Sequence, residues 1–449
     1  MASRLYSGRR RRFMDRMKDG VAIFQSAPTA SRNGDVEHPY RQDSDFFYLT
    51  GFEEPGAIAV LSRSGRKRTF TLFVQPNDPE MEVWTGRKAG MDGAVEKYGA
   101  NEAYARTEFA ERLPGILTNR DRLYVRFGKD TDFDGTVTRA IEALKAEARK
   151  GVFGPWELID PRRILWDMRL CKDPQEIKAL EKACEITKAA FGSAMRAVRP
   201  GMGEWELAAV VEFEFRRRGS PRIGFETICA SGANATTLHY ISNDSRIGAD
   251  YLVLIDAGAE YQMMTADISR TFPASGRFSE PGLTVYKWVL EAQKAAIAAV
   301  RPGVTYREVH ETALNVLCRG LKSMGVLKGS VAKIIEKGAY QPFFMHRIGH
   351  WLGSDVHDVG AYFDGSKSIR LRPGAVITIE PGLYFPVSDK SPEHLRGIGV
   401  RIEDDVLVTS KGNRVLTEGL PKEPAEIEKW MAGPDSWWDG LKPVSIKRG

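Results

Sequence analysis

The chain has 449 residues, of which 42% are hydrophobic and 28% are charged, and its formal net charge is +6. This length exceeds what one hydrophobic core usually supports, so two domains are expected, and the composition excludes an intrinsically disordered chain. No apolar run approaches the roughly 20 residues of a membrane span, and no signal-peptide core follows the first charges, so we expect a cytoplasmic protein with no membrane partner.

Four consecutive arginines, Arg9 to Arg12, lie near the start of the chain. Such a run occurs in nucleic-acid-binding arms and in organelle presequences. The acidic Asp15 and Asp19 follow closely, which favours a solvated helix face instead. The sequence therefore predicts no nucleic-acid partner. The cysteines are scattered, form no CxxC pair and are expected to be free thiols: Cys171, Cys184, Cys229 and Cys318.

The first third of the chain alternates short β-rich segments, such as residues 57–61 and 69–74, with helical stretches, which predicts an α/β N-terminal domain. Near Leu170 the pattern changes, because Asp173 and Pro174 begin a long helical stretch that continues through Arg196. We expect an N-terminal domain at 1–170, a catalytic domain at 171–425 and a C-terminal tail at 426–449. The tail carries Trp430, Trp437 and Trp438 and is expected to dock on the body or on a neighbouring subunit.

The second half contains a short internal sequence repeat. Residues 197–201 and 299–303 have the same sequence, Ala-Val-Arg-Pro-Gly, and each copy ends one helical pattern and precedes another. Self-similarity at this distance predicts two related αβ halves, although five identical residues could also arise by chance. Because each half runs into strands that carry acidic residues, these residues are expected at the seam between the halves.

An apolar run at 252–255 ends in Asp256, and Asp267 leads into the next predicted strand. A hairpin turning tightly around Tyr261 and Gln262 would place the two aspartates directly opposite each other, about 5 Å apart at Cβ. Like charges at that distance are destabilising unless a cation lies between them. The alternative is that one aspartate is an ordinary turn residue near Gly258.

Two more strands carry carboxylates. The strand at 376–379 delivers Glu380 just before a chain break, and the alternation over 400–406 places Arg401 and Glu403 on one face. Taken alone, Arg401 and Glu403 could be only a surface ion pair.

Histidines are concentrated in one segment, since three of the seven in the chain are His346, His350 and His357. Glycines are interleaved with them, which favours a site over a single hydrogen-bonded core histidine. Four carboxylates with one imidazole suit Mn²⁺ and similar ions better than structural zinc, although Zn²⁺ or Co²⁺ could also bind. The sequence therefore predicts a two-metal hydrolase.

The ordered set of candidate ligands resembles the metal centre of the pita-bread metallopeptidases: Asp256, Asp267, His350, Glu380 and Glu403. Within that superfamily, the motifs at 346–353, 379–384 and 396–404 are most similar to Xaa-Pro aminopeptidase (aminopeptidase P). Similar motifs at 40–52 and 84–87 extend the resemblance into the first domain. It implies an α/β N-terminal domain before a duplicated, pseudo-two-fold α+β pita-bread catalytic domain. It also implies a homo-oligomer, either dimer or tetramer.

The resemblance further implies release of the N-terminal residue from peptides with proline in the second position. Two divalent metal ions are implied, with Mn²⁺ preferred. Asp256 would bind one ion, His350 and Glu380 the other, and Asp267 and Glu403 would bridge both. A bridging hydroxide would attack the carbonyl before proline, with Glu380 accepting the water proton.

The substrate site is also implied by the resemblance. His239, His346 and His357 would line it and steady the peptide carbonyl or the developing oxyanion. Arg401 would support the bridging carboxylates. Trp84 resembles a residue that reaches the substrate pocket of a neighbouring subunit, and its alternative is an ordinary core tryptophan. Phe225 departs from the family, because many relatives have a tyrosine there.

Three other functions share these features. A prolidase, which cleaves only Xaa-Pro dipeptides, has the same ligands, and Arg347, Arg396 or Arg401 could hold its substrate's carboxylate. Some prolidase relatives also hydrolyse organophosphorus esters. Methionine aminopeptidases share the ligand set but need no long α/β domain in front. Non-catalytic pita-bread binding proteins lose ligands, and here all five are present.

Overall fold

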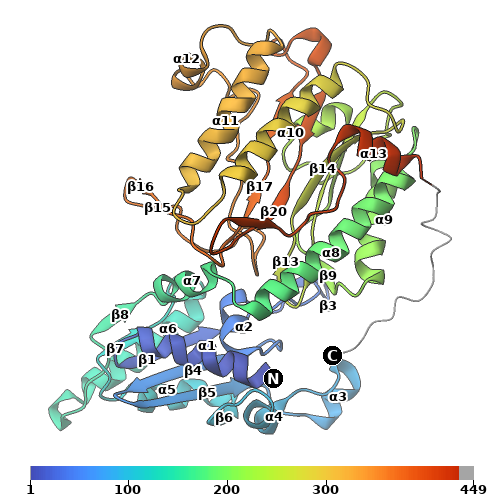
Figure 1. The fold of residues 1–449 in the computed structure, drawn as a ribbon. Helices are drawn as coiled ribbons and strands as arrows, with labels where there is room; N and C mark the ends of the chain where they lie inside the picture. Colours follow the sequence, from blue (N-terminus) through green and yellow to red (C-terminus); the bar gives the residue numbers. More distant parts are fainter. Residues whose placement is uncertain (1, 434–449) are drawn as a thin grey trace. The chain divides into compact units, whose positions relative to one another are not determined.

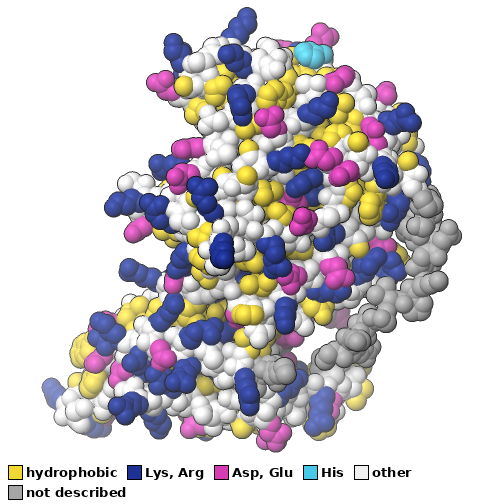
Figure 2. Space-filling view, viewed as in Figure 1, with side chains coloured by type: hydrophobic (Ala, Val, Ile, Leu, Met, Phe, Trp, Pro, Cys, Tyr) yellow, Lys and Arg dark blue, Asp and Glu magenta, His cyan; other side chains and the backbone are white. Residues whose placement is uncertain are grey.

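The computed structural model describes residues 2–433, and the chain divides into two compact units, Met1–Arg169 and Leu170–Gly449 (Figure 1). Each unit has its own hydrophobic core. Within the described residues, no helix combines the length and the apolar character that crossing a membrane requires. On the face drawn in Figure 2, Lys and Arg side chains are interspersed with Asp and Glu.

Unit 1 contains one six-stranded mixed sheet. Its strand order is β6 (Glu102–Ala105), β5 (Lys67–Val74), β4 (Ile58–Ser64), β1 (Gly20–Gln25), β7 (Arg122–Tyr124) and β8 (Glu157–Ile159). The strand β4 pairs antiparallel with β1 and β5, and the other neighbours are parallel. The remaining elements are a small hairpin of β2 (Ser31–Asn33) and β3 (Val36–Glu37), and the helices α1 (Ala2–Arg16), α2 (Ser44–Thr50), α3 (Pro79–Thr85), α4 (Gly90–Glu96), α5 (Phe109–Leu117), α6 (Thr131–Ala146) and α7 (Arg162–Leu170).

Both faces of this sheet are buried, which explains the continuous apolar runs of its strands. In β1, Ala22 and Phe24 face a core formed with α1 and α2, whereas Val21 and Ile23 face a core formed with α5 and α6. The predicted α/β architecture of the N-terminal domain is confirmed.

The four-arginine run is only partly the solvated face that the sequence suggests. Arg9 and Arg10 are each 3% exposed, so the expectation is wrong for these two. The guanidinium of Arg9 lies 4.2 Å from the ring centre of Tyr48, and that of Arg10 lies 3.9 Å from the ring centre of Phe70. Aromatic rings accept a guanidinium through their negative faces, so two of the four charges stabilise the packing of α1.

Unit 2 contains two helix pairs, α8 (Pro174–Ala197) with α9 (Glu204–Arg217), and α10 (Gly282–Ala299) with α11 (Tyr306–Ser323) (Figure 1). The first half adds the strands β9 (Arg222–Ile223), β10 (Ile228–Ser231), β11 (Leu252–Ala257), β12 (Ala259–Tyr261), β13 (Met264–Thr265) and β14 (Ile268–Pro273). The second half adds α12 (Val331–Glu336), β15 (Phe363–Asp364), β16 (Lys367–Ser368), β17 (Val376–Ile379), β18 (Gly382–Phe385), β19 (Ile398–Arg401), β20 (Asp404–Val408), β21 (Asn413–Val415) and α13 (Pro424–Met431).

The repeated Arg-Pro-Gly segments adopt the same conformation in both halves. Gly201 and Gly303 each have φ +84°, in the left-handed region that favours glycine. Their amides donate to the carbonyls of Ile247 and Leu371, each of which lies shortly before a β-rich segment. The sequence repeat therefore marks equivalent turns of a duplicated fold, as the sequence predicts.

The expected C-terminal tail begins inside α13. Ile427 is completely buried in the unit 2 core, and the Trp430 indole donates to the carbonyl oxygen of Gly192 at 3.1 Å. This part of the segment is docked on the body of the unit. Trp437 and Trp438 lie outside the described residues.

His310 on α11 is a partly buried histidine whose ring stacks on Phe344 and whose Nδ1 has no hydrogen-bond partner among residues 2–433. Burial, and then Arg347, lowers its pKa to about 4. The unfolded chain therefore binds more protons than the native state between about pH 6.5 and pH 4, so stability falls as the pH drops through this window.

We expect His310→Phe to remove this term, which is at most about 2 kcal/mol between pH 7.5 and pH 5. Urea unfolding at both pH values measures it, with the exposed His394→Gln as the control. A pH-dependent loss in His310→Phe as large as in wild type would contradict the expectation.

Candidate metal centre

The hairpin that carries the first two candidate ligands has a different register from the predicted one. In the pairing of β11 with β14, Asp256 lies opposite Ser269 and Ala257 lies opposite Ile268. The prediction that Asp256 faces Asp267 directly is therefore wrong. The turn residues are Gln262 and Met263, with φ of 48° and 63°.

Two consecutive left-handed residues are typical of the tight hairpin turns that match strand twist. Because this turn lies one residue later than expected, the partner of Asp256 moves by two. Continuing the register places Asp267 across from Gly258, where an added Cβ would lie only 1.7 Å from the Ala266 carbonyl oxygen. The two aspartates are thus diagonal neighbours on the same face of the hairpin.

The other two carboxylates come from the second half of the unit. Glu380 directly follows β17, and Glu403 lies in the break between β19 and β20. The Glu403 amide donates to the carbonyl oxygen of Ser269 at 3.0 Å, which joins the two halves at the ligands. The strand expected at 400–406 is interrupted here, but Arg401 and Glu403 both face one cavity.

That cavity has a volume of about 490 Å³ and lies within unit 2. It brings together every candidate metal ligand, every candidate catalytic side chain and every candidate substrate-binding side chain except Trp84: Asp256, Asp267, His350, Glu380, Glu403, His239, His346, His357 and Arg401. Trp84 belongs to unit 1 and is 82% exposed, so the alternative that it is a core tryptophan is wrong.

His350 is positioned to offer one nitrogen to the cavity. Its Nδ1 lies 3.0 Å from the Trp351 carbonyl oxygen and must donate to it, which leaves the Nε2 lone pair free. Nε2 lies 3.2 Å from Oδ2 of Asp267 and 3.6 Å from Oε1 of Glu380. Ligand atoms of Asp267, His350 and Glu403 all lie within 4.8 Å of one another.

Arg401 organises the opposite side of the site and is 3% exposed. It donates to Oδ2 of Asp256 at 2.5 Å, to the Ser269 hydroxyl at 2.9 Å and to the Tyr384 hydroxyl at 3.0 Å. Ser269 in turn donates to Oε2 of Glu403 at 2.9 Å. Oδ1 of Asp256 is buried and has no hydrogen-bond partner among the described residues.

The carboxylates of the site repel one another, and burial makes their charged forms unfavourable. Burial raises the pKa of Asp267, Glu403 and Glu380, and the negative charge of neighbouring carboxylates raises each pKa further. Divalent cations stabilise the charged carboxylates, because they supply positive charge at a site that is shielded from water. The donor set, the free Nε2 and the orphaned Asp256 oxygen therefore fit a pair of oxygen-preferring metal ions.

His346 is held neutral next to these acids. Its Nδ1 donates to the Arg347 carbonyl oxygen at 2.7 Å, so its Nε2 accepts from the Tyr384 hydroxyl at 2.9 Å. Burial, and then Arg401, lowers the pKa of His346 to about 3. The pKa of His357 is also lowered by burial, and its ring centre lies 4.3 Å from that of His350.

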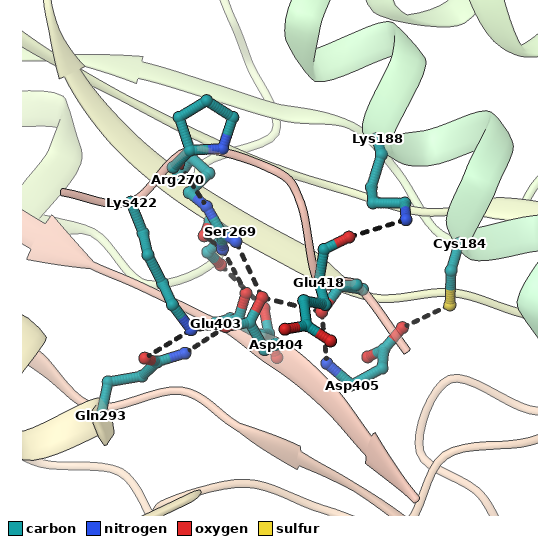
Figure 3. Close-up of polar contacts among 12 residues, drawn as sticks. Cys184, Lys188, Ser269, Arg270, Gln293, Glu403, Asp404, Asp405, Glu418 and Lys422 are labelled. Carbon is teal, nitrogen blue, oxygen red and sulfur yellow. Dashed lines mark hydrogen bonds and ion pairs between the residues drawn. The ribbon is translucent and has the colours of Figure 1, made fainter. Parts of the chain in front are cut away.

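A second polar network lies beneath Glu403, and sequence reasoning did not find it (Figure 3). The Asp404 carboxylate accepts from Arg270, Lys422, Gln293 and Thr417 at 2.6 to 2.7 Å. Arg270 also donates to the carbonyl oxygens of Ser269 and Glu403. Although burial raises it, Arg270 and Lys422 hold the pKa of Asp404 below its usual range. An arginine between Ser269 and Thr271, in a strand that begins and ends with apolar residues, was the available signal.

Asp405 supports the other bridging candidate. Its Oδ2 accepts from the Asp267 amide at 3.1 Å. It also accepts from the Cys184 thiol at 3.2 Å (Figure 3). Burial raises the pKa of Asp405 to about 7. The acidic triplet 403–405 therefore faces three directions, with Glu403 in the cavity and its two neighbours in the supporting structure.

Comparisons with known proteins agree with this site. The profile of metallopeptidase family M24 matches residues 178–410, and that of the aminopeptidase P N-terminal domain matches residues 6–124. The chain is 41% identical to the Xaa-Pro aminopeptidase of Escherichia coli over 95% of this chain and 97% of that protein. It is 35% identical to human Xaa-Pro aminopeptidase 3, over 92% of this chain and 80% of that one.

Solved structures give the same result. The aminopeptidase PepP of Pseudomonas aeruginosa superposes with a TM-score of 0.93 at 44% identity, covering 96% of this chain and 98% of that one. A structure of Escherichia coli aminopeptidase P in complex with substrate has the same coverage and TM-score at 40% identity. The chain therefore belongs to metallopeptidase family M24 and, within it, to the Xaa-Pro aminopeptidases.

Proposed function

We propose that the unit 2 cavity binds two divalent cations and releases the N-terminal residue from peptides whose second residue is proline. The observation that carries this proposal is the convergence of three buried carboxylates, the half-buried Glu380 and the free Nε2 of His350 on one cavity. Family membership supports the reaction class, because the related proteins with similar sequences are Xaa-Pro aminopeptidases.

The residues would divide the cations as follows. Asp256 would hold one ion, His350 and Glu380 the other, and Asp267 and Glu403 would lie between them. When bound, the ions would lower the pKa of a water nucleophile and polarise the peptide carbonyl. Mn²⁺ is the proposed ion, with Zn²⁺ and Co²⁺ as alternatives, and one related structure is a zinc-substituted aminopeptidase P.

The chain's own groups would move the proton and orient the peptide. Glu380, whose pKa burial raises, would accept a proton from the water. His239, His346 and His357 would bind the peptide carbonyls and the developing oxyanion. Arg401 would hold Asp256, and through Ser269 it would also hold Glu403.

The cavity also suits the proline ring. Proline has no amide hydrogen, so recognition relies on shape and apolar contact more than on a backbone hydrogen bond. The cavity lining includes the apolar side chains Phe225, Ile228, Leu238, Ile241 and Val356. Phe225 supplies no hydroxyl group here, so its contribution is contact alone.

Trp84 would act through assembly of a cytoplasmic homo-oligomer, dimer or tetramer. The short helix α3 buries none of its residues, and Val83 and Trp84 are 85% and 82% exposed. Exposed apolar side chains of this size are typical of protein interfaces. We propose that Trp84 enters the substrate cavity of a neighbouring subunit.

Peptide cleavage with controlled metal content tests the proposed function. We expect Mn²⁺-loaded protein to cleave Ala-Pro-Ala, releasing alanine, and we expect EDTA to abolish cleavage and added Mn²⁺ to restore it. Mass spectrometry of the products and metal analysis measure both effects. Activity confined to the dipeptide Ala-Pro would indicate a prolidase, and full activity in metal-free protein would refute the metal proposal.

A further inference from the structure

Three arginines are candidates for binding a carboxylate group of the substrate, and the structure commits two of them to other contacts. Arg401 is bound to Asp256, Ser269 and Tyr384. Arg396 donates to the carbonyl oxygens of Ser388 and Ser391 at 3.1 and 3.2 Å, and it is not among the residues that line the cavity. Arg347 is the remaining candidate.

Arg347 lines the cavity and its side chain is exposed to solvent. Its guanidinium lies 5.7 Å from the ring centre of Phe363, and no carboxylate among the described residues pairs with it. The hydrogen bond from His346 ends on the backbone oxygen of Arg347, so it does not occupy the guanidinium. The guanidinium of this lining residue therefore keeps five N–H donors and a full positive charge accessible to solvent.

The charge balance of the cavity gives this cation a role. Bound divalent ions would neutralise the buried carboxylates, and Arg401 is already paired with Asp256. Glu226 also lines the cavity, but among the described residues no ion pair joins it to Arg347, so Arg347 remains a lining cation without a direct counter-charge. The cation–π contact with Phe363 favours one placement of the guanidinium, and a side chain that is already placed has a lower entropy cost of binding a carboxylate.

We propose that Arg347 binds a carboxylate that follows proline in the peptide, and so gives the enzyme a preference for short peptides with a free C-terminus or for an acidic residue after proline. The inference rests on the proposed function and deepens it, because it names a feature of the substrate, the carboxylate after proline, that the metal centre does not recognise. Guanidinium–carboxylate pairing is charge-assisted and can be bidentate, which makes it a strong discriminator between peptides.

A comparison of substrate charge with enzyme variants tests the proposal. We expect wild type to cleave Ala-Pro-Ala with a kcat/KM about tenfold to a hundredfold above that for its C-terminal amide. In Arg347→Ala the ratio of acid to amide should fall close to one. The matched control is Arg307→Ala, because Arg307 lies 5.5 Å from the ring centre of the same Phe363 but does not line the cavity. This variant should keep the wild-type ratio.

A third peptide, Ala-Pro-Glu-amide, separates the two sources of the carboxylate. A rate equal to that of the free acid would assign the acidic side chain as a ligand, and a rate equal to that of the neutral amide would assign the C-terminal carboxylate alone. A wild-type acid-to-amide ratio near one with no gain from glutamate, or a preference that persists in Arg347→Ala, would overturn the proposal.

Calorimetric binding of Pro-Ala and its amide gives the same comparison without turnover. A protein that prefers the acid in this assay but cleaves no peptide would contradict the proposed function while supporting the role of Arg347. Equal binding of the two ligands by a protein that cleaves Ala-Pro-Ala would contradict only the role of Arg347.

Discussion

Asp267→Ala is expected to lower kcat/KM for Ala-Pro-Ala at least about 1,000-fold while the protein stays folded, because it would remove the proposed ligand shared by two cations and with it several kcal/mol of transition-state stabilisation. Asp267 is 4% exposed and its Oδ2 lies 3.2 Å from His350 Nε2, so no mobile side chain can easily replace it. Steady-state kinetics with Mn²⁺ in excess measures the loss.

Stability measurements distinguish a lost ligand from a misfolded chain. In EDTA, the isosteric Asp267→Asn should be at least as stable as wild type, because it removes one of several mutually repelling buried carboxylates. Excess Mn²⁺ should stabilise wild type by about 4 kcal/mol at a thousand times its Kd, and the variant much less. The exposed Asp250→Ala is the control. Equal stabilisation of Asp267→Asn and wild type by Mn²⁺ would contradict the ligand role.

Asp404→Asn is expected to destabilise the protein by about 3–5 kcal/mol, because it leaves the completely buried Arg270 without its counter-charge. The loss should also weaken metal binding, since Arg270 donates to the carbonyl oxygen of Glu403, a proposed ligand. Urea unfolding in EDTA measures the first effect, and metal titration measures the second.

Lys422→Met is the matched control for the Asp404 network. The Lys422 side chain is 25% exposed and shares Asp404 with Arg270, so its removal leaves the buried pair intact. We expect a loss of about 1 kcal/mol or less, in the range of partly exposed ion pairs. A loss of stability as large as that of Asp404→Asn would show that Lys422, and not the buried Arg270, contributes most to the stability of the network.

Sequence reasoning identified the side chains of the site better than their arrangement. All five candidate ligands line one cavity, and the four carboxylates lie within or directly beside short strands that a local pattern predicts, whereas His350 lies outside the strands. The predicted hairpin register was wrong because the turn lies one residue later than expected, and this shift changes every pairing between the two strands. Gln262 and Met263 adopt left-handed conformations although neither is a residue typical of such turns.

Long-range contacts explain what sequence could not supply. Arg270 lies more than a hundred residues before Asp404 and Lys422 in the chain. No local sequence pattern predicts that these three residues meet. Arg9 and Arg10 appear from sequence to be solvated for the same reason, since the rings that accept them come from α2 and β5. Polar residues that are buried by distant partners carry little signal in a single sequence.

The attachment of Pro421 and Lys422 to Arg270 and Asp404 has a consequence for biosynthesis. A ribosome makes these two residues after unit 1 and after the strands that carry Asp256 and Asp267. The support beneath Glu403 can close only once residue 422 has been made. Nascent chains that stop before residue 417 would contain every ligand and yet lack the anchors that hold one of them in place.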